Sequence, residues 1–166
     1  MKIKDVMTRS PVVISVHAKV REAAALLREH HVGGLPVMDG EKVVGMVTES
    51  DILSLLNPGG ISNDLWLPSP LEVIEVPIRE LYNWERTREA LSDIGDAEVS
   101  SIMSRDVISI TAGADIEEGA AVMLREEIGR LPVIEDGKLV GIVTRSDLVR
   151  GLGLRHAGEG GERDQR

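Results

Sequence analysis

The sequence predicts an α+β protein made of two copies of one small unit. The stretch GMVTESD at residues 45–51 returns as GIVTRSD at residues 141–147. Matching proline, glycine, threonine and aspartate residues stand at a constant separation of 96 positions, which is the pattern of an internal repeat. One copy has roughly 55 residues, a size at which a lone hydrophobic core is marginal. We therefore expect the two copies to pack against each other.

Each copy begins with a strand and a helix. The β-branched runs at residues 12–16 and 107–110 are typical of short strands, and we expect small length differences between the copies around this first strand. After each run, small or apolar residues recur at offsets of three, four and seven from Val20 and from Ile116. This spacing places them on one face of a helix.

A hairpin and a second helix complete each copy. The segments LPVM and LPVI predict a second strand, and Asp39-Gly40 and Asp136-Gly137 are dipeptides suited to tight turns. The runs KVVGMVT and KLVGIVT predict a third strand, which enters a helix at Ser50-Asp51 or at Ser146-Asp147. The predicted order is β-α-β-β-α, twice.

Composition divides the chain into four parts: a first copy at residues 1–57, a connector at 58–98, a second copy at 99–154 and a tail at 155–166. The connector carries −6 of the formal net charge of −9. It also contains every aromatic residue of the chain, Trp66, Tyr82 and Trp84. We expect it to be structured, with a helix over residues 78–94. The polar, glycine-rich tail is expected to be disordered.

Several function classes are disfavoured by composition. The net charge of −9 argues against a general nucleic-acid binder. Cysteine is absent, which excludes disulfides and thiolate sites. The N-terminus lacks the apolar segment of a secretory signal, and no apolar run reaches membrane-spanning length, so we expect a cytoplasmic protein. His30 and His31 are adjacent in a predicted helix and point in different directions, and no metal site is expected. No nucleophile motif indicates an enzyme.

The repeated strand-to-helix corner has two interpretations. Thr48 with Asp51, and Thr144 with Asp147, fit a capping box that starts a helix. The same corner leaves backbone N–H groups that can bind an anion. The residues alone leave both interpretations open.

The repeated LPV and G-apolar-V-T-x-x-D segments, in this order of elements, resemble a tandem pair of CBS domains, the Bateman module, over residues 1–57 and 99–154. The resemblance implies two repeats packed through their sheets with pseudo-twofold symmetry. It implies two clefts that bind adenosine-containing ligands such as AMP, ADP, ATP, S-adenosylmethionine or NAD, with the motif aspartate accepting hydrogen bonds from the ribose. It also implies a homodimer and a non-catalytic regulatory role without a catalytic cofactor.

The family pattern assigns residues of both copies to each cleft. By resemblance, the cleft of Asp147 is formed by Ile142, Thr144, Ser146, Asp147 and Arg130, with Arg145 beside them and Thr8, Val13 and Val32 from the first copy. The cleft of Asp51 is formed by Met46, Thr48, Ser50 and Asp51, with Ser104, Ile108 and Ile128 from the second copy. Without aromatic residues in either copy, the base is expected to lie between aliphatic side chains.

The two clefts are expected to differ in charge. The second copy has Arg130 and Arg145 where the first has Gly34 and Glu49. Because arginine matches phosphate oxygens with a planar fork of donors, we expect the Asp147 cleft to bind a phosphorylated ligand such as AMP or ADP. The Asp51 cleft is then weaker, empty, or suited to an uncharged or cationic adenosine derivative. The alternative is that both arginines are ordinary surface charges.

Two hypotheses for function follow. The first is an adenosine-nucleotide-sensing regulatory module that acts on a separate protein. The second is a dimeric scaffold with vestigial clefts, in which Trp66 and Trp84 of the connector are contact anchors.

Overall fold

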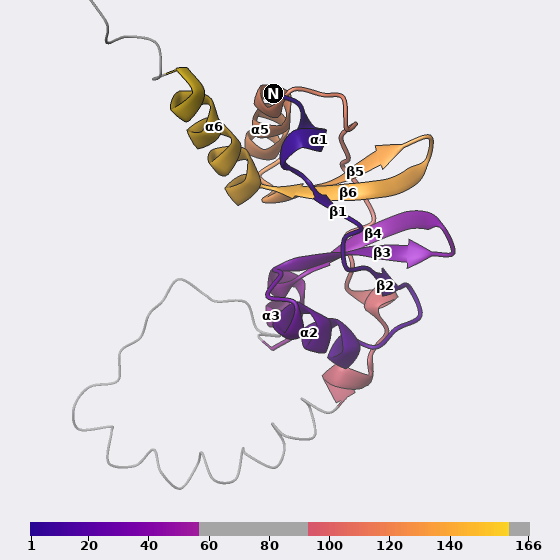
Figure 1. The fold of residues 1–166 in the computed structure, drawn as a ribbon. Coiled ribbons are helices and arrows are strands. Elements are labelled where there is room, and N and C mark those ends of the chain that lie inside the picture. The colour runs from indigo at the N-terminus through magenta and orange to yellow at the C-terminus, as the bar shows by residue number, and fades with distance from the viewer. Residues whose placement is uncertain (57–92, 160–166) are drawn as a thin grey trace, which may run out of the picture.

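The computed structural model describes residues 1–56 and 93–159, and these form two three-stranded sheets accompanied by helices (Figure 1). The first copy contributes α1 (Ile3–Val6), β1 (Thr8–Arg9), β2 (Ile14–Ser15), α2 (Val20–Glu29), β3 (Gly34–Asp39), β4 (Lys42–Thr48) and α3 (Glu49–Leu56). The second contributes the 3₁₀ helix η1 (Val99–Ser101), α5 (Ile116–Arg125), β5 (Arg130–Glu135), β6 (Lys138–Thr144) and α6 (Arg145–Glu159). The α+β class and the repeated helix–hairpin–helix order are confirmed.

The two hairpins have the same register and different turns. Strands β3 and β4, and strands β5 and β6, pair antiparallel with an irregularity after Val37 and after Val133. Asp136 and Gly137 both have positive φ, of 50° and 76°, as a type I′ turn requires. In the first hairpin Gly40 alone has positive φ, 59°, because Asp39 is still the last residue of β3.

The first strand of each copy is shorter than expected. The segments before and after this strand have the same number of residues in both copies. Ile14 pairs with Val37 in a parallel ladder, and Ile110 forms a single parallel bridge with Val133. Both residues of the second pairing lie 96 positions after those of the first. The expected length difference is therefore wrong. The strand expected at residues 107–110 is reduced to one bridged residue, because no other residue of that run pairs with β5.

The N-terminal segment of each copy is bound to the sheet of the other copy. Strand β1 pairs antiparallel with β6, with Thr8 opposite Ile142, so the sheet of the second copy has the order β1-β6-β5. Reciprocally, Ser104 pairs with Met46 of β4, and their backbone hydrogen bonds measure 2.9 and 3.0 Å. The copies thus exchange their first segments across the pseudo-twofold axis.

The hydrophobic cores follow the same exchange. Ile3 and Val6 of the first copy pack in the core of the second, where α1 lies beside α6 (Figure 1). Val99 and Met103 of the second copy pack in the core of the first. Ile3 and Val99 are both completely buried. Since burial of apolar area is the main source of stability, each core is completed by residues from the other copy.

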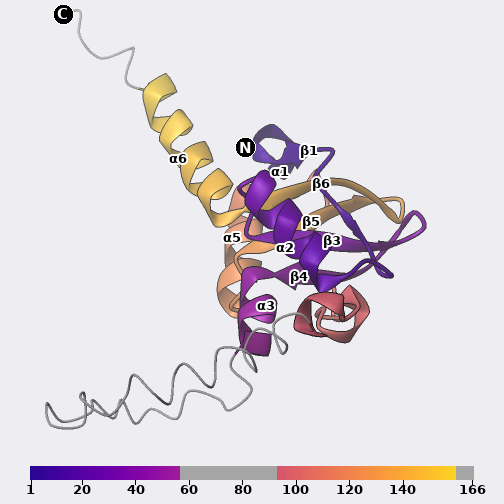
Figure 2. The same ribbon diagram turned by 90° about the horizontal axis from the view of Figure 1, so that it is seen from below.

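The ends of the copies differ from the expected boundaries. Helix α6 continues to Glu159 and extends away from the sheets (Figure 2), so the tail expected to be disordered from Arg155 begins within a helix. Of the connector, residues 93–96 are helical, and residues 97–98 are also described. Residues 57–92, which include the three aromatic residues and most of the helix expected at 78–94, and residues 160–166 lie outside the described part. None of the helices described is long and apolar enough to cross a bilayer.

Substitution of the glycine of each third strand is expected to destabilise the protein. A Cβ atom at Gly45 would lie 2.8 Å from the Ser104 carbonyl oxygen, and one at Gly141 would lie 2.9 Å from that of Thr8. We expect Gly45→Ala and Gly141→Ala each to lower the free energy of unfolding by ~1–3 kcal/mol, measured by urea denaturation. Gly113→Ala is the control, because no atom lies within 4 Å of its added Cβ. Equal stability of all three variants would contradict the proposed close contact.

Candidate functional site: paired pockets between the two copies

The strand-to-helix corners have the same hydrogen bonds in both copies. The Asp51 Oδ2 atom accepts from the Thr48 backbone N–H at 2.7 Å and from the Thr48 hydroxyl at 2.8 Å. The Asp147 Oδ2 atom accepts from the corresponding Thr144 groups at 2.9 and 2.7 Å. Each threonine Oγ1 in turn accepts from the aspartate N–H, at 3.4 and 3.3 Å. These contacts form the expected capping box.

The capping role accounts for only one oxygen of each carboxylate. In both copies the threonine bonds to Oδ2 alone. The second oxygen, Oδ1, is left for another donor, and in the second copy Arg150 donates to it. Capping and ligand binding are therefore compatible functions of the same residue.

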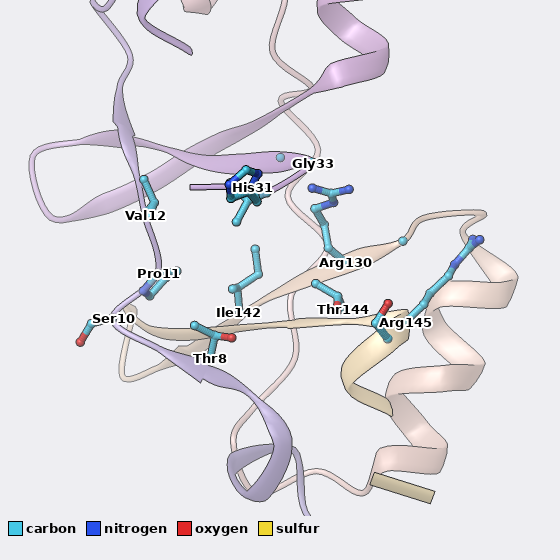
Figure 3. A pocket seen from close by; sticks show the side chains of 14 residues that line it. Thr8, Ser10, Pro11, Val12, His31, Gly33, Arg130, Ile142, Thr144 and Arg145 are labelled. Atoms are coloured by element: carbon cyan, nitrogen blue, oxygen red, sulfur yellow. The ribbon is translucent and has the colours of Figure 1, made fainter. Parts of the chain in front are cut away.

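A pocket of about 570 Å³ lies between the copies beside the start of α6, within the usual range for small-molecule sites. Figure 3 shows its walls, which come from β1 and the following loop, the loop before β3, and strands β5 and β6. The lining residues are Thr8, Ser10, Pro11, Val12, His31, Val32, Gly33, Gly34, Gly129, Arg130, Ile142, Thr144, Arg145 and Ser146. We call this the α6 pocket.

A second pocket of about 440 Å³ lies beside the start of α3. It is lined by Met46, Thr48, Ser50, Asp51, Ser104, Asp106, Ile108, Glu126, Glu127, Ile128, Gly129 and Arg130. We call it the α3 pocket. Most of its lining positions repeat those of the α6 pocket at the separation of 96, so the pseudo-twofold axis relates the two pockets.

The structure brings most of the predicted residues together. All seven predicted for the Asp51 cleft line the α3 pocket. Of those predicted for the Asp147 cleft, seven line the α6 pocket. The other two are Val13 and Asp147. Asp147 is 7% exposed and is hydrogen-bonded to Thr144, which lines the pocket.

Val13 lies outside the α6 pocket. It is 40% exposed and contributes to a shallow depression near the hairpin ends. Val12 occupies the wall instead, at the position equivalent to Ile108. The error follows from the assumed length difference, which shifted the first copy out of alignment at this strand.

The two pockets have opposite charge. His31 and Arg145 line the α6 pocket, which has no carboxylate among its lining residues. The α3 pocket instead has four carboxylates in its wall: Asp51, Asp106, Glu126 and Glu127. The sequence identified Arg130, Arg145 and Asp51 as pocket residues, and the prediction missed Asp106, Glu126, Glu127 and His31. The constant separation of 96, which pairs Ser10 with Asp106 and His31 with Glu127, was the signal that could have found them.

Arg130 lies between the two pockets and lines both. In Figure 3 its side chain extends from β5 toward Gly33. A Cβ atom at Gly34 would lie 2.5 Å from an Arg130 guanidinium nitrogen, so the glycine leaves room for the arginine. Burial lowers the pKa of Arg130, and the nearby charge of Glu49 partly opposes this shift. Arginine nevertheless stays protonated at neutral pH.

Arg145 takes a different direction. Its Nε donates to the Ile128 carbonyl oxygen at 3.2 Å, and the side chain extends toward the loop before β5 (Figure 3). Arg130 is therefore the more central cation of the α6 pocket.

Removal of either capping carboxylate is expected to destabilise the protein without any ligand. Asp51→Ala and Asp147→Ala each remove an acceptor for two donors, and we expect each to lower the free energy of unfolding by ~0.5–2 kcal/mol. Chemical denaturation of the ligand-free protein measures this effect. The exposed Asp39 at the end of β3 provides the control, Asp39→Ala, with an expected change within ~0.5 kcal/mol. A purely ligand-binding aspartate would leave the ligand-free stability unchanged.

Comparisons with known proteins agree on the fold. An uncharacterized protein of Methanocaldococcus jannaschii, MJ1426, is 36% identical over 154 residues, which cover 92% of this chain and 91% of that protein. CBSX2, a CBS domain-containing protein of Arabidopsis thaliana, has been solved in complex with AMP. That structure is 27% identical, with a TM-score of 0.67, and the match covers 92% of this chain and 97% of the other. The AcuB protein of Vibrio cholerae is 25% identical, with a TM-score of 0.69 and 98% of both chains covered.

The family model of the CBS domain matches two segments, residues 3–58 and 99–153. They contain the two copies with their exchanged strands and both capped corners. The chain belongs to the CBS domain family, as a tandem pair of these domains.

Proposed function

We propose that this protein is a non-catalytic regulatory module that binds an adenosine nucleotide, AMP or ADP, in its α6 pocket. The observation that carries the proposal is the pairing of that pocket with a capped helix start and a central, partly buried arginine. The AMP complex of the similar CBSX2 protein supports the ligand class.

The residues of the α6 pocket divide into three sets by chemistry. Val12, Val32 and Ile142 provide an aliphatic slot for the base. Arg130 and the hydroxyl group of Ser146 provide donors for phosphate oxygens, whereas the Thr144 hydroxyl already donates to Asp147. Asp147, which is hydrogen-bonded to Thr144, is proposed as the acceptor for the ribose hydroxyls. The three sets match the apolar, anionic and hydroxyl parts of a nucleotide.

The α3 pocket is proposed to disfavour phosphate. Its four carboxylates stand against a single cation, Arg130, and like charge repels an anion at short range. An uncharged or cationic adenosine derivative, of the class of S-adenosylmethionine, suits this pocket better.

Regulation is proposed to act through the relative placement of the two copies, since each pocket has walls from both. A ligand shifts such an equilibrium only by its different affinity for the two states. The exposed Leu53 of α3 and its counterpart Val149 of α6, 61% and 69% exposed, favour pairing with a second copy of the chain. A separate regulated protein would then bind the two states of the dimer with different affinity. In the alternative hypothesis, the protein is a dimeric scaffold with vestigial clefts, and its function requires no ligand.

AMP is expected to bind with an affinity that depends on Arg130 and Asp147. We expect Arg130→Ala and Asp147→Ala each to weaken AMP binding about tenfold or more, since each removes hydrogen bonds to a charged group. Isothermal titration calorimetry measures the dissociation constant. Asp51→Ala is the matched control, because it makes the same change at the equivalent position of the α3 pocket. Unchanged AMP affinity in both α6-pocket variants, or no AMP binding to the unmodified protein, would contradict the proposal.

Binding is expected to be selective between the two pockets. AMP should titrate to one molecule per chain, because the carboxylates of the α3 pocket repel a second phosphate. The double variant Glu126→Gln, Glu127→Gln is expected to raise the stoichiometry toward two. Two sites of equal AMP affinity in the unmodified protein would contradict the proposal that the carboxylates make binding selective.

A further inference from the structure

The second oxygen of Asp147 is held by an arginine on the same helix. Arg150 donates from a guanidinium nitrogen to Asp147 Oδ1 at 2.5 Å. Asp147 Oδ2 already accepts from both Thr144 donors. The side chain of Asp147 is only 9% exposed, whereas that of Arg150 is 64% exposed. The carboxylate therefore has a protein donor on each oxygen, and one of these donors is a largely exposed cation.

The equivalent position in the first copy has no such cation. Ser54 stands 96 residues before Arg150, and its hydroxyl donates to the Ser50 carbonyl oxygen at 2.8 Å. Asp51 lines its pocket, while Asp147 is absent from the wall of the larger one. The capping contacts of the two aspartates are otherwise alike. Arg150 is thus the feature that distinguishes the two carboxylates.

We propose that Arg150 is a specificity-determining latch, which competes with the ribose hydroxyls of the nucleotide for Asp147. The inference rests on the proposed function of the α6 pocket. A ribose hydroxyl that donates to Oδ1 must first displace the guanidinium. Because the arginine is mostly exposed, its ion pair is weak and can open at small cost. The latch reduces the contribution of the ribose to binding, so the pocket selects its ligand mainly through the phosphate.

A ligand pair that differs only in the ribose hydroxyls tests this latch. The dissociation constants of AMP and 2′,3′-dideoxy-AMP are measured by calorimetry for the unmodified protein, Arg150→Ala, Ser54→Ala and Lys138→Ala. Ser54→Ala is the matched change on α3. Lys138→Ala removes one positive charge of similar exposure, 70%, at a hairpin end. Loss of a positive charge by itself weakens the binding of an anion, so tighter binding has to come from the freed carboxylate.

Arg150→Ala is expected to tighten AMP binding about two- to fivefold, the range of an exposed ion pair, and to leave dideoxy-AMP binding within about twofold. Neither Ser54→Ala nor Lys138→Ala is expected to tighten AMP binding.

Three results would overturn it: weaker AMP binding in Arg150→Ala, equal tightening of both ligands, or no change. If AMP binding still depends on Arg130 and Asp147 in any of these cases, the proposed function survives and only the latch fails. If neither the unmodified protein nor Arg150→Ala binds AMP, both fail together.

Discussion

The close backbone contact between each copy's N-terminal segment and the other copy's third strand determines most of this architecture. The carbonyl oxygens of Thr8 and Ser104 lie so near Gly141 and Gly45 that a methyl group would not fit. This contact brings Ile3 and Val99 into the opposite cores. It also makes Thr8 and Ser104 part of the two pocket walls. Core completion and pocket formation therefore depend on one pairing, since a loss of the exchange would remove a buried apolar side chain and a wall together.

The charged residues of the two copies do not follow the pseudo-twofold symmetry of the backbone. Arg130 reaches across the axis because its counterpart is Gly34, and burial gives its charge a stronger effect than a surface arginine has. Glu49, at the position equivalent to Arg145, acts on Arg130 from the first copy. The backbone thus defines two similar pockets, and a few side chains give each a different charge.

Local patterns in the sequence were sufficient for the repeat, the class of fold and the capped corners. Most of the pocket residues were predicted from the resemblance to the CBS domain family. The exchange of N-terminal segments was not predicted, since it depends on pairing between residues far apart in the chain. Val13 was chosen over Val12 because the letters VIS recur at residues 13–15 and 107–109, a local identity that misled the alignment. Only the parallel pairing of Ile14 and Ile110 with the central strands gives the true correspondence. The contact of Arg150 with Asp147 was likewise missed, because helical spacing permits such a pair without requiring it.

The reciprocal exchange has a consequence for how such a protein can diversify. A single copy could bury its own core fully only by associating with another, and two identical partners would necessarily form two identical hollows. Joining both partners in one polypeptide makes that association independent of concentration. It also allows each copy to change independently. Equivalent positions therefore hold Ser10 in one copy and Asp106 in the other, and likewise His31 and Glu127. Covalent linkage thereby allows one molecule to carry two pockets of related shape and different charge.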